Sequence, residues 1–223
     1  MATEADARNR ILDAALVIAD ARSWEAVRLA EAARDADIPL AQVPTWFREK
    51  EDLVDAWFAR ADQALLRDAA TRDCQGLAPR ARMHRGIMTW LGALAPHRRV
   101  TRQMVLGRLE PGHLHTQYRA LRGVSRTVQW LREAAGRDAR YPWRAVEETV
   151  LTGIFMTTFT YWLWDDSADA VRSARLLDRL LRCAEPMARV TPLGARPATH
   201  RPGAEDPPRR SSKTPPPAGA PGP

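Results

Sequence analysis

Between residues 10 and 53 the sequence breaks into short apolar segments, each with the spacing of an amphipathic helix. Apolar residues recur three and four positions apart over 10–21 and again over 27–36. Pro39 begins a third compact segment, which ends at Phe47 and is followed by a charged turn and a long helix. Because short helices in this order form a helix-turn-helix, the sequence predicts that motif here.

The helical spacing continues through most of the chain, with turn residues between the segments. Further helices are expected over 51–72, 80–95, 100–109, 113–135, 141–164 and 168–188. We find no strand pattern and no internal repeat in the sequence, so an all-α fold of about nine helices is predicted.

Composition divides the chain into three parts. Residues 1–50 contain the helix-turn-helix pattern and are called the head, and residues 51–190 contain the longer helices and are called the body. Residues 191–223 are rich in proline, glycine and arginine and have few apolar side chains. A segment of that composition cannot bury enough apolar surface to fold, so a disordered tail is predicted.

The formal net charge of the chain is +7. This charge suits a polyanionic partner, such as nucleic acid or acidic lipid, and it equally suits a coding bias, because lysine occurs only at positions 50 and 213. Cys74 and Cys183 are far apart in sequence, which favours a reduced, cytoplasmic protein. We see no apolar run of the ~20 residues that a membrane span needs, so membrane insertion is not expected.

Four stretches of the N-terminal part, 11–16, 24–27, 29–33 and 45–53, resemble the TetR family of bacterial transcriptional regulators. The resemblance implies an all-helical, TetR-like fold and a homodimer whose interface is formed by the last two long helices. It also implies a ligand cavity in the body and a third helix that enters the major groove of double-stranded DNA. It therefore indicates a ligand-responsive regulator, most simply a repressor with a hydrophobic effector.

The resemblance places the DNA contacts in and around the third helix. The residues concerned are Arg28, Arg34, Leu40, Gln42, Pro44, Thr45, Trp46, Arg48 and Lys50. Leu40, Ala41 and Pro44 stand where the family usually has a lysine, a glycine or hydroxyl residue, and a tyrosine. Leu40 and Pro44 offer no group that binds phosphate, and the arginines suit a solvated surface as well as they suit DNA.

Pro44 also affects the geometry expected of the third helix. Proline lacks an N–H group and clashes with the carbonyl four residues earlier, at a cost of ~3 kcal/mol in a helix interior. The sequence therefore leaves two alternatives: the third helix begins only at Val43 and Pro44, or it is kinked there.

A second resemblance lies in the C-terminal helices. Residues 159–167 and 176–181 are similar to the TetR-fold lipid-binding proteins of coenzyme Q biosynthesis. This resemblance implies an alternative function, a lipid- or isoprenoid-binding accessory protein whose DNA-reading helix is degenerate. The amphipathic membrane helix of that group would fall in 191–223, where this chain is rich in proline and glycine instead.

Large apolar side chains at helical spacing in the body have two explanations. They form plain core, which is the more frequent outcome, or they line a pocket for an apolar ligand. The candidate lining residues are Trp90, Met104, Trp130, Phe155, Phe159 and Trp162. The candidate residues for the implied dimer interface, on the last helix, are Val171, Ala174, Leu177 and Leu181.

Enzyme motifs are not evident in the sequence. We find no glycine-rich phosphate loop, no GxSxG nucleophile motif and no HExxH zinc motif. His113 and His115 are two residues apart, so on a helix they would face different sides and would not form a metal pair. We therefore expect no catalytic residue, cofactor or metal ion.

Overall fold

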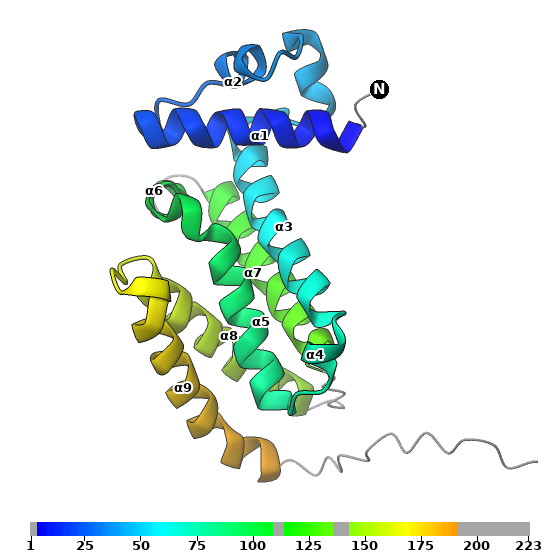
Figure 1. Ribbon diagram of the computed structural model, residues 1–223, viewed down its shortest axis with the longest axis vertical. Helices are drawn as coiled ribbons and strands as arrows, with labels where there is room; N and C mark the ends of the chain where they lie inside the picture. The colour runs from blue at the N-terminus through cyan, green and yellow to red at the C-terminus, as the bar shows by residue number, and fades with distance from the viewer. Residues whose placement is uncertain (1–3, 109–113, 136–142, 191–223) are drawn as a thin grey trace, which may run out of the picture. The chain divides into compact units, whose positions relative to one another are not determined.

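The structure is a computed structural model that describes residues 4–108, 114–135 and 143–190. Over these residues it contains α-helices, short 3₁₀ helices and turns but no strand, which confirms the predicted all-α fold (Figure 1). The α-helices are α1 (Glu4–Ala21), α2 (Leu29–Asp35), α3 (Lys50–Ala69), α4 (Arg72–Gln75), α5 (Pro79–Leu94), α6 (Arg98–Arg108), α7 (Leu114–Ala134), α8 (Trp143–Trp162) and α9 (Val171–Val190). The 3₁₀ helices are η1 (Leu40–Thr45), η2 (Ala95–His97) and η3 (Ala168–Ala170).

The described residues belong to one compact unit in which α3 continues the chain from the head into the body and α6 also contacts α1. In the head, α1 packs on α2, and α2 contacts η1. From there α3 runs along α5 and α7 (Figure 1), while α9 packs on α5 and α8. None of the described helices combines the length and the apolar character that crossing a membrane requires. The predicted tail, 191–223, lies outside the described residues.

The core of the head is made of apolar side chains from all of its elements. Ile11, Leu12 and Leu16 on α1 are at most 1% exposed. After α2 the chain reverses at Asp37, whose φ of 55° lies in the left-handed region, and Ile38 N–H donates to the Ala33 carbonyl oxygen. This reversal ends α2 and directs Ile38 into the core, where it is 6% exposed.

The core of the body is dominated by aromatic rings on α3, α5 and α8. The ring of Trp90 stacks on Phe58 at a centroid distance of 5.9 Å and meets the edges of Phe155 and Phe159 at 5.1 and 5.3 Å. Asp62 is buried beside these rings and accepts hydrogen bonds from Trp90 Nε1 at 2.9 Å and from a threonine on α7, Thr127 Oγ1, at 2.7 Å. The body core is therefore aromatic but not wholly apolar.

The predicted helix over 51–72 is shorter in the structure. It ends at Ala69, and Thr71 begins the separate short helix α4 because its hydroxyl accepts a hydrogen bond from Cys74 N at 3.3 Å. The last predicted helix, over 168–188, is also divided, since the turn η3 precedes α9 and contains Asp169 with a φ of 50°. Both differences arise at hydroxyl and carboxylate side chains that cap or turn the backbone, which hydrophobic periodicity does not detect.

Candidate nucleic-acid interface

The third helical element of the head, η1, is a 3₁₀ helix of 6 residues that contains Pro44 in its interior. Neither sequence alternative is correct, because the helix begins at Leu40 and its whole length is 3₁₀. Proline fixes φ near −65°, which lies within the 3₁₀ range, and in so short a helix its missing N–H removes little hydrogen bonding. The segment thus accommodates Pro44 by changing helix type.

The side chains of η1 divide into one buried anchor and several exposed positions. Val43 is 2% exposed and packs in the head core with Phe47. Side chains three residues apart line up along a 3₁₀ helix. One exposed row is therefore Ala41 with Pro44, and the other is Gln42 with Thr45. Leu40 is 56% exposed at the start of the helix.

Trp46 closes η1 against the first helix. Its ring is half-buried, and Nε1 donates a hydrogen bond to Glu4 Oε1 at 3.2 Å. Both Trp46 N and Phe47 N donate to the Val43 carbonyl oxygen, which ends the helix. Trp46 therefore holds η1 on α1 and presents less surface to a partner than Gln42 or Thr45 does.

Two of the predicted cationic contacts, Arg28 and Lys50, meet at one backbone carbonyl. Arg28 Nη1 donates to the Glu25 carbonyl oxygen at 2.7 Å, and Lys50 Nζ donates to the same oxygen at 3.1 Å. Lys50 Nζ also lies 4.9 Å from the centre of the Trp24 ring. Burial lowers the pKa of Lys50, and the charge of Arg28 lowers that pKa further. An anion placed beside this pair of cations would relieve their repulsion.

Arg34, a third predicted contact, lies on the outer surface of α2 among carboxylates. It donates to Asp35 Oδ1 at 3.3 Å and lies 3.8 Å from Glu31. Glu31 is also bonded by Arg22 at 2.6 Å, and this hydrogen bond lowers the pKa of the glutamate. Arg34 thus has carboxylate partners in the free protein and would exchange them for a phosphate only at some cost.

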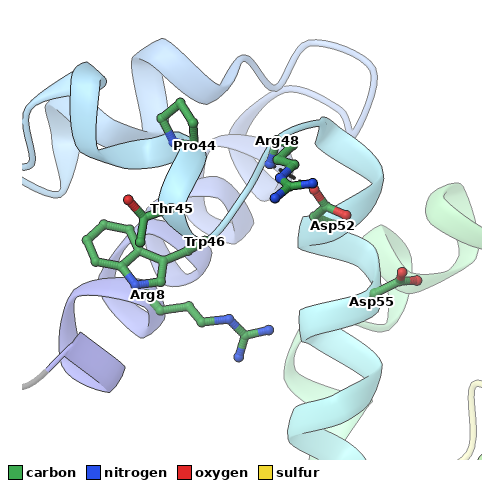
Figure 2. Close-up of a pocket in the computed structure, with 7 residues that line it drawn as sticks. All are labelled: Arg8, Pro44, Thr45, Trp46, Arg48, Asp52 and Asp55. Atoms are coloured by element: carbon green, nitrogen blue, oxygen red, sulfur yellow. Dashed lines mark hydrogen bonds between the residues drawn. The ribbon is translucent and has the colours of Figure 1, made fainter.

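An open hollow lies beside the C-terminal end of η1 (Figure 2) and has a volume of about 340 Å³. It brings together predicted contacts from η1 and the following turn with residues of α1 and α3. The lining residues are Arg8, Pro44, Thr45, Trp46, Arg48, Asp52 and Asp55. Asp52 Oδ2 accepts hydrogen bonds from the backbone N–H groups of Arg48 at 2.8 Å and Glu49 at 3.1 Å, which fixes the turn after η1. Two arginine side chains, Arg8 and Arg48, therefore flank this end of the element.

The predicted ligand pocket of the body is filled by its own candidate residues. Trp90, Phe155, Phe159 and Trp162 contact one another as rings, with centroid distances of 5.1 to 6.2 Å. Met104 is also buried in the core, at 1% exposed. Trp130 departs from the prediction, because it is 39% exposed on α7 and so does not line the interior with the others.

The predicted dimerisation residues of α9 do not share one surface. Val171 is 42% exposed and Ala174 is half-buried. Leu177 and Leu181 are buried within the same chain and so offer no surface to a partner in this arrangement, and their assignment to a dimer interface stays a prediction. A continuous apolar stripe on a helix does not reveal which neighbour covers it. Here the buried part of the stripe is covered by other helices of this chain.

The exposed apolar surface of α8 and α9 is made by other side chains. They line a shallow surface hollow and are Met156, Thr157, Thr160, Tyr161 and Leu176. Trp164, just after α8, is 51% exposed. Sequence reasoning placed 159–167 in an aromatic helix end but did not single out this surface.

Polar contacts that join the end of α1 and the residues just after it to η2 and α6 were not predicted. Gln103 Oε1 accepts a hydrogen bond from Trp24 N at 2.7 Å, and His97 Nδ1 is paired with Asp20. These partners are 79 and 77 positions apart, so no local pattern in the sequence could pair them. The buried Asp62 did leave a signal, because it falls on the apolar face of α3.

The sequence matches no protein-family model and none of the curated proteins. Solved structures do match it. The chain is similar to a TetR transcriptional regulator from Nitrosomonas europaea ATCC 19718, with 43% identity, coverage of 80% of this chain and 97% of that chain, and a TM-score of 0.72. A TetR transcriptional regulator from Rhodococcus sp. RHA1 is 18% identical over 80% of this chain and 97% of that chain, with a TM-score of 0.55, and this second likeness concerns the fold alone.

Proposed function

The chain belongs to the TetR family of transcriptional regulators, and from this premise we propose that residues 1–50 bind operator DNA and residues 51–190 form the effector-responsive, dimer-forming body. The observation that carries the proposal is η1, whose buried Val43 fixes it to the head while the rows Ala41/Pro44 and Gln42/Thr45 face solvent. A short helix held in this way suits insertion into the major groove.

Phosphate binding is assigned to cations around η1, since the element itself has none. Arg28 and Lys50 form one positive pair, and Arg8 and Arg48 flank the C-terminal end of η1. Contacts of this kind position a protein on the duplex and supply most of the salt-dependent affinity. Arg34 is a weaker candidate because it has carboxylate partners in the free protein.

A homodimer through α8 and α9 is proposed as the functional state. The exposed side chains of Met156 and Tyr161, with the half-buried Leu176, give these helices an apolar surface that a second copy would cover. A two-fold dimer carries two heads, which suits two half-sites on one face of the duplex. Cytoplasmic location follows as part of the same proposal, because the operator is there.

Regulation is proposed to pass from the aromatic cluster of the body to α6 and then to α1. Arg98 at the start of α6 lies over the Trp162 ring at 4.7 Å and donates to the Asp165 carbonyl oxygen. His97 of η2 is paired with Asp20 of α1, and Gln103 of α6 accepts from Trp24 N just after α1. An apolar effector that enters by parting the rings would displace Trp162 and so change this connection. Release of DNA, as in a repressor, then requires that the effector bind the displaced state more tightly.

The test is fluorescence anisotropy of the full chain on labelled duplexes from the region upstream of its own gene. We expect the wild-type chain to bind with a sequence preference and with an affinity that falls steeply as salt increases. Arg48→Ala should reduce the magnitude of the slope of log affinity against log salt by about 0.9, the value for one lost phosphate contact. Arg72→Ala, at an exposed position on α4 outside the head and the proposed dimer surface, is the matched control and should leave the slope unchanged. Absence of salt-sensitive, sequence-preferring binding would remove the proposal.

The lipid-binding alternative is kept because Tyr161 and Trp164 are 44% and 51% exposed at the end of α8. Aromatic side chains of this kind suit a lipid partner as well as a second protomer. Native mass spectrometry of the purified chain separates the two. A dimer without additional mass supports the regulator, whereas a monomer carrying an isoprenoid or phospholipid supports the accessory protein.

A further inference from the structure

The surface that η1 offers to DNA has an unusual chemical composition for an element that contacts bases. Leu40, Ala41 and Pro44 present only carbon atoms from their side chains, and Gln42 and Thr45 present the polar ones. We infer that η1 recognises A·T base pairs, with adenine bound by the Gln42 amide and thymine methyl groups bound by the apolar side chains. The inference rests on the proposed function and names the bases at that same site.

The hydrogen-bonding pattern of the major groove supports this assignment. Adenine presents an acceptor and a donor there, N7 and N6, and the side-chain amide of glutamine matches both. Guanine presents two acceptors, which are usually bound by arginine or lysine, and the six residues of η1 include neither. Gln42 is exposed, so its amide is available to a base without a change in the head core.

The apolar side chains complete the match to A·T pairs. Thymine is the only base with a methyl group in the major groove, and small apolar side chains contact it. Ala41 and Pro44 lie one 3₁₀ turn apart in a single row, and Leu40 precedes them at 56% exposed. Burying these groups against methyls would remove apolar surface from water on both partners.

The dimensions limit how many base pairs η1 can recognise. A 3₁₀ helix rises ~2.0 Å per residue, so η1 covers about 12 Å, roughly three to four base pairs. Arg8 and Arg48 lie beside its C-terminal end rather than on its exposed rows, which assigns them to the flanking phosphates. Each half-site is thus inferred to have a short A·T core.

The first experiment selects duplexes from a randomised library with the full chain and then measures affinities by anisotropy. We expect A·T pairs at the core of each enriched half-site. Replacing core thymines by deoxyuridine, which lacks only the methyl group, should weaken binding about 3- to 10-fold. Gln42→Ala should reduce the preference for adenine at one position by about 5- to 150-fold, which corresponds to the ~1–3 kcal/mol of one bidentate pair.

A gain of specificity provides the sharper test. Gln42→Arg should shift the preference at the same position from adenine to guanine, because a guanidinium matches the two guanine acceptors. Gln63→Arg is the matched control, since Gln63 is exposed on α3 outside η1, and it adds the same charge without altering base preference.

The outcomes separate this inference from the proposed function. Specific, salt-sensitive binding to a G·C core, unaffected by deoxyuridine and by substitution of Gln42, overturns the inference and leaves the regulator proposal in place. No selective enrichment together with no salt-sensitive binding overturns both.

Discussion

The interiors of the head and the body differ in kind. In the described residues of the head every fully buried side chain is apolar, with Ile11, Leu16 and Phe47 at its centre. The buried polar and charged side chains of the described chain all lie in the body and are Asp62, Thr101, Arg108, Thr127, Arg132, Thr158, Asp165 and Ser173. The head therefore keeps its polar chemistry on the outside, while the body has hydrogen bonds within its core.

This difference suits the separate tasks proposed for the two regions. Among the described residues, the head core contains no polar side chains that could exchange hydrogen-bond partners. Its apolar packing therefore holds η1 in one position relative to α1. A buried polar group needs its partners, because an unpaired one costs roughly 1–3 kcal/mol. Hydrogen bonds such as those between Asp62 and Trp90 therefore favour particular arrangements of the body helices, which an effector would have to exchange for others.

The largest effect is expected from truncating one aromatic ring in each core. Phe47→Ala in the head and Phe155→Ala in the body should each lower the free energy of unfolding by about 3–5 kcal/mol, because both side chains are at most 2% exposed and would leave cavities. Chemical denaturation monitored by circular dichroism gives this free energy.

The location of the lost hydrogen-exchange protection shows how independently the head and the body unfold. Hydrogen exchange should show that Phe47→Ala loses protection first in α1 and α2, and Phe155→Ala first in α5 and α8. Phe58 is not a suitable control because it is half-buried and its ring stacks on Trp90. Val17→Ala, at a side chain that is 64% exposed, serves instead. A uniform loss of protection over both regions for both variants would break the distinction between them.

The sequence predicts a helix and its bounds well where the helix has a single apolar stripe that packs against its neighbours. The expected helix over 80–95 agrees with α5 to one residue at each end, because its apolar stripe packs on α3 and α7. Periodicity fails where proline selects the helix type, as Pro44 does in η1. Periodicity also leaves open what covers Leu177 and Leu181, since an apolar stripe does not distinguish a partner chain from a helix of the same chain.

The candidate site is only partly predictable for a related reason. Exposed residues of η1, such as Gln42 and Thr45, are found from the motif, because their positions relative to the buried Val43 are local. The sharing of the Glu25 carbonyl by Arg28 and Lys50 depends on how the turn before α2 meets the start of α3. That contact is tertiary, and a single sequence has no signal for it.

An intermediate effect is expected for two aspartates that accept backbone N–H groups, Asp165 in the body and Asp52 at the edge of the head. Asp165 is 3% exposed and accepts from the N–H and hydroxyl of both Ser167 and Ser173, at 2.6 to 3.0 Å. Asp165→Asn should cost about 2–3 kcal/mol at neutral pH, because the amide group turns a donor toward these donors. Asp52→Asn, at a more exposed cap, should cost about 1 kcal/mol.

The dependence on pH distinguishes the buried aspartate further. Burial alone would raise the pKa of Asp165, but the hydrogen bonds from Ser167 and Ser173 outweigh it and hold the pKa well below its usual value. The group therefore stabilises the fold above its unfolded pKa of about 3.9, and this stabilisation is lost as the pH falls below about 4. Urea denaturation from pH 3 to 7 should show a smaller acid-induced loss in Asp165→Asn than in the wild type, and an unchanged acid limb would contradict the assigned role.

The smallest effect is expected from prolines at matched places in the two regions. Pro44→Ala inside η1 and Pro79→Ala at the first turn of α5 both increase the conformational freedom of the unfolded chain, which should lower the free energy of unfolding by about 0.5–1 kcal/mol each. Pro79 is the control because that position suits proline without strain. A different result would be that Pro44→Ala leaves the free energy of unfolding unchanged or raises it, while backbone chemical shifts over 40–47 move toward α-helical values. That result would mean that Pro44 keeps η1 in the 3₁₀ form although the segment itself prefers an α-helix. The geometry of the DNA-facing rows would then depend on that single ring, since an α-helix would rotate Gln42 and Thr45 away from a common row.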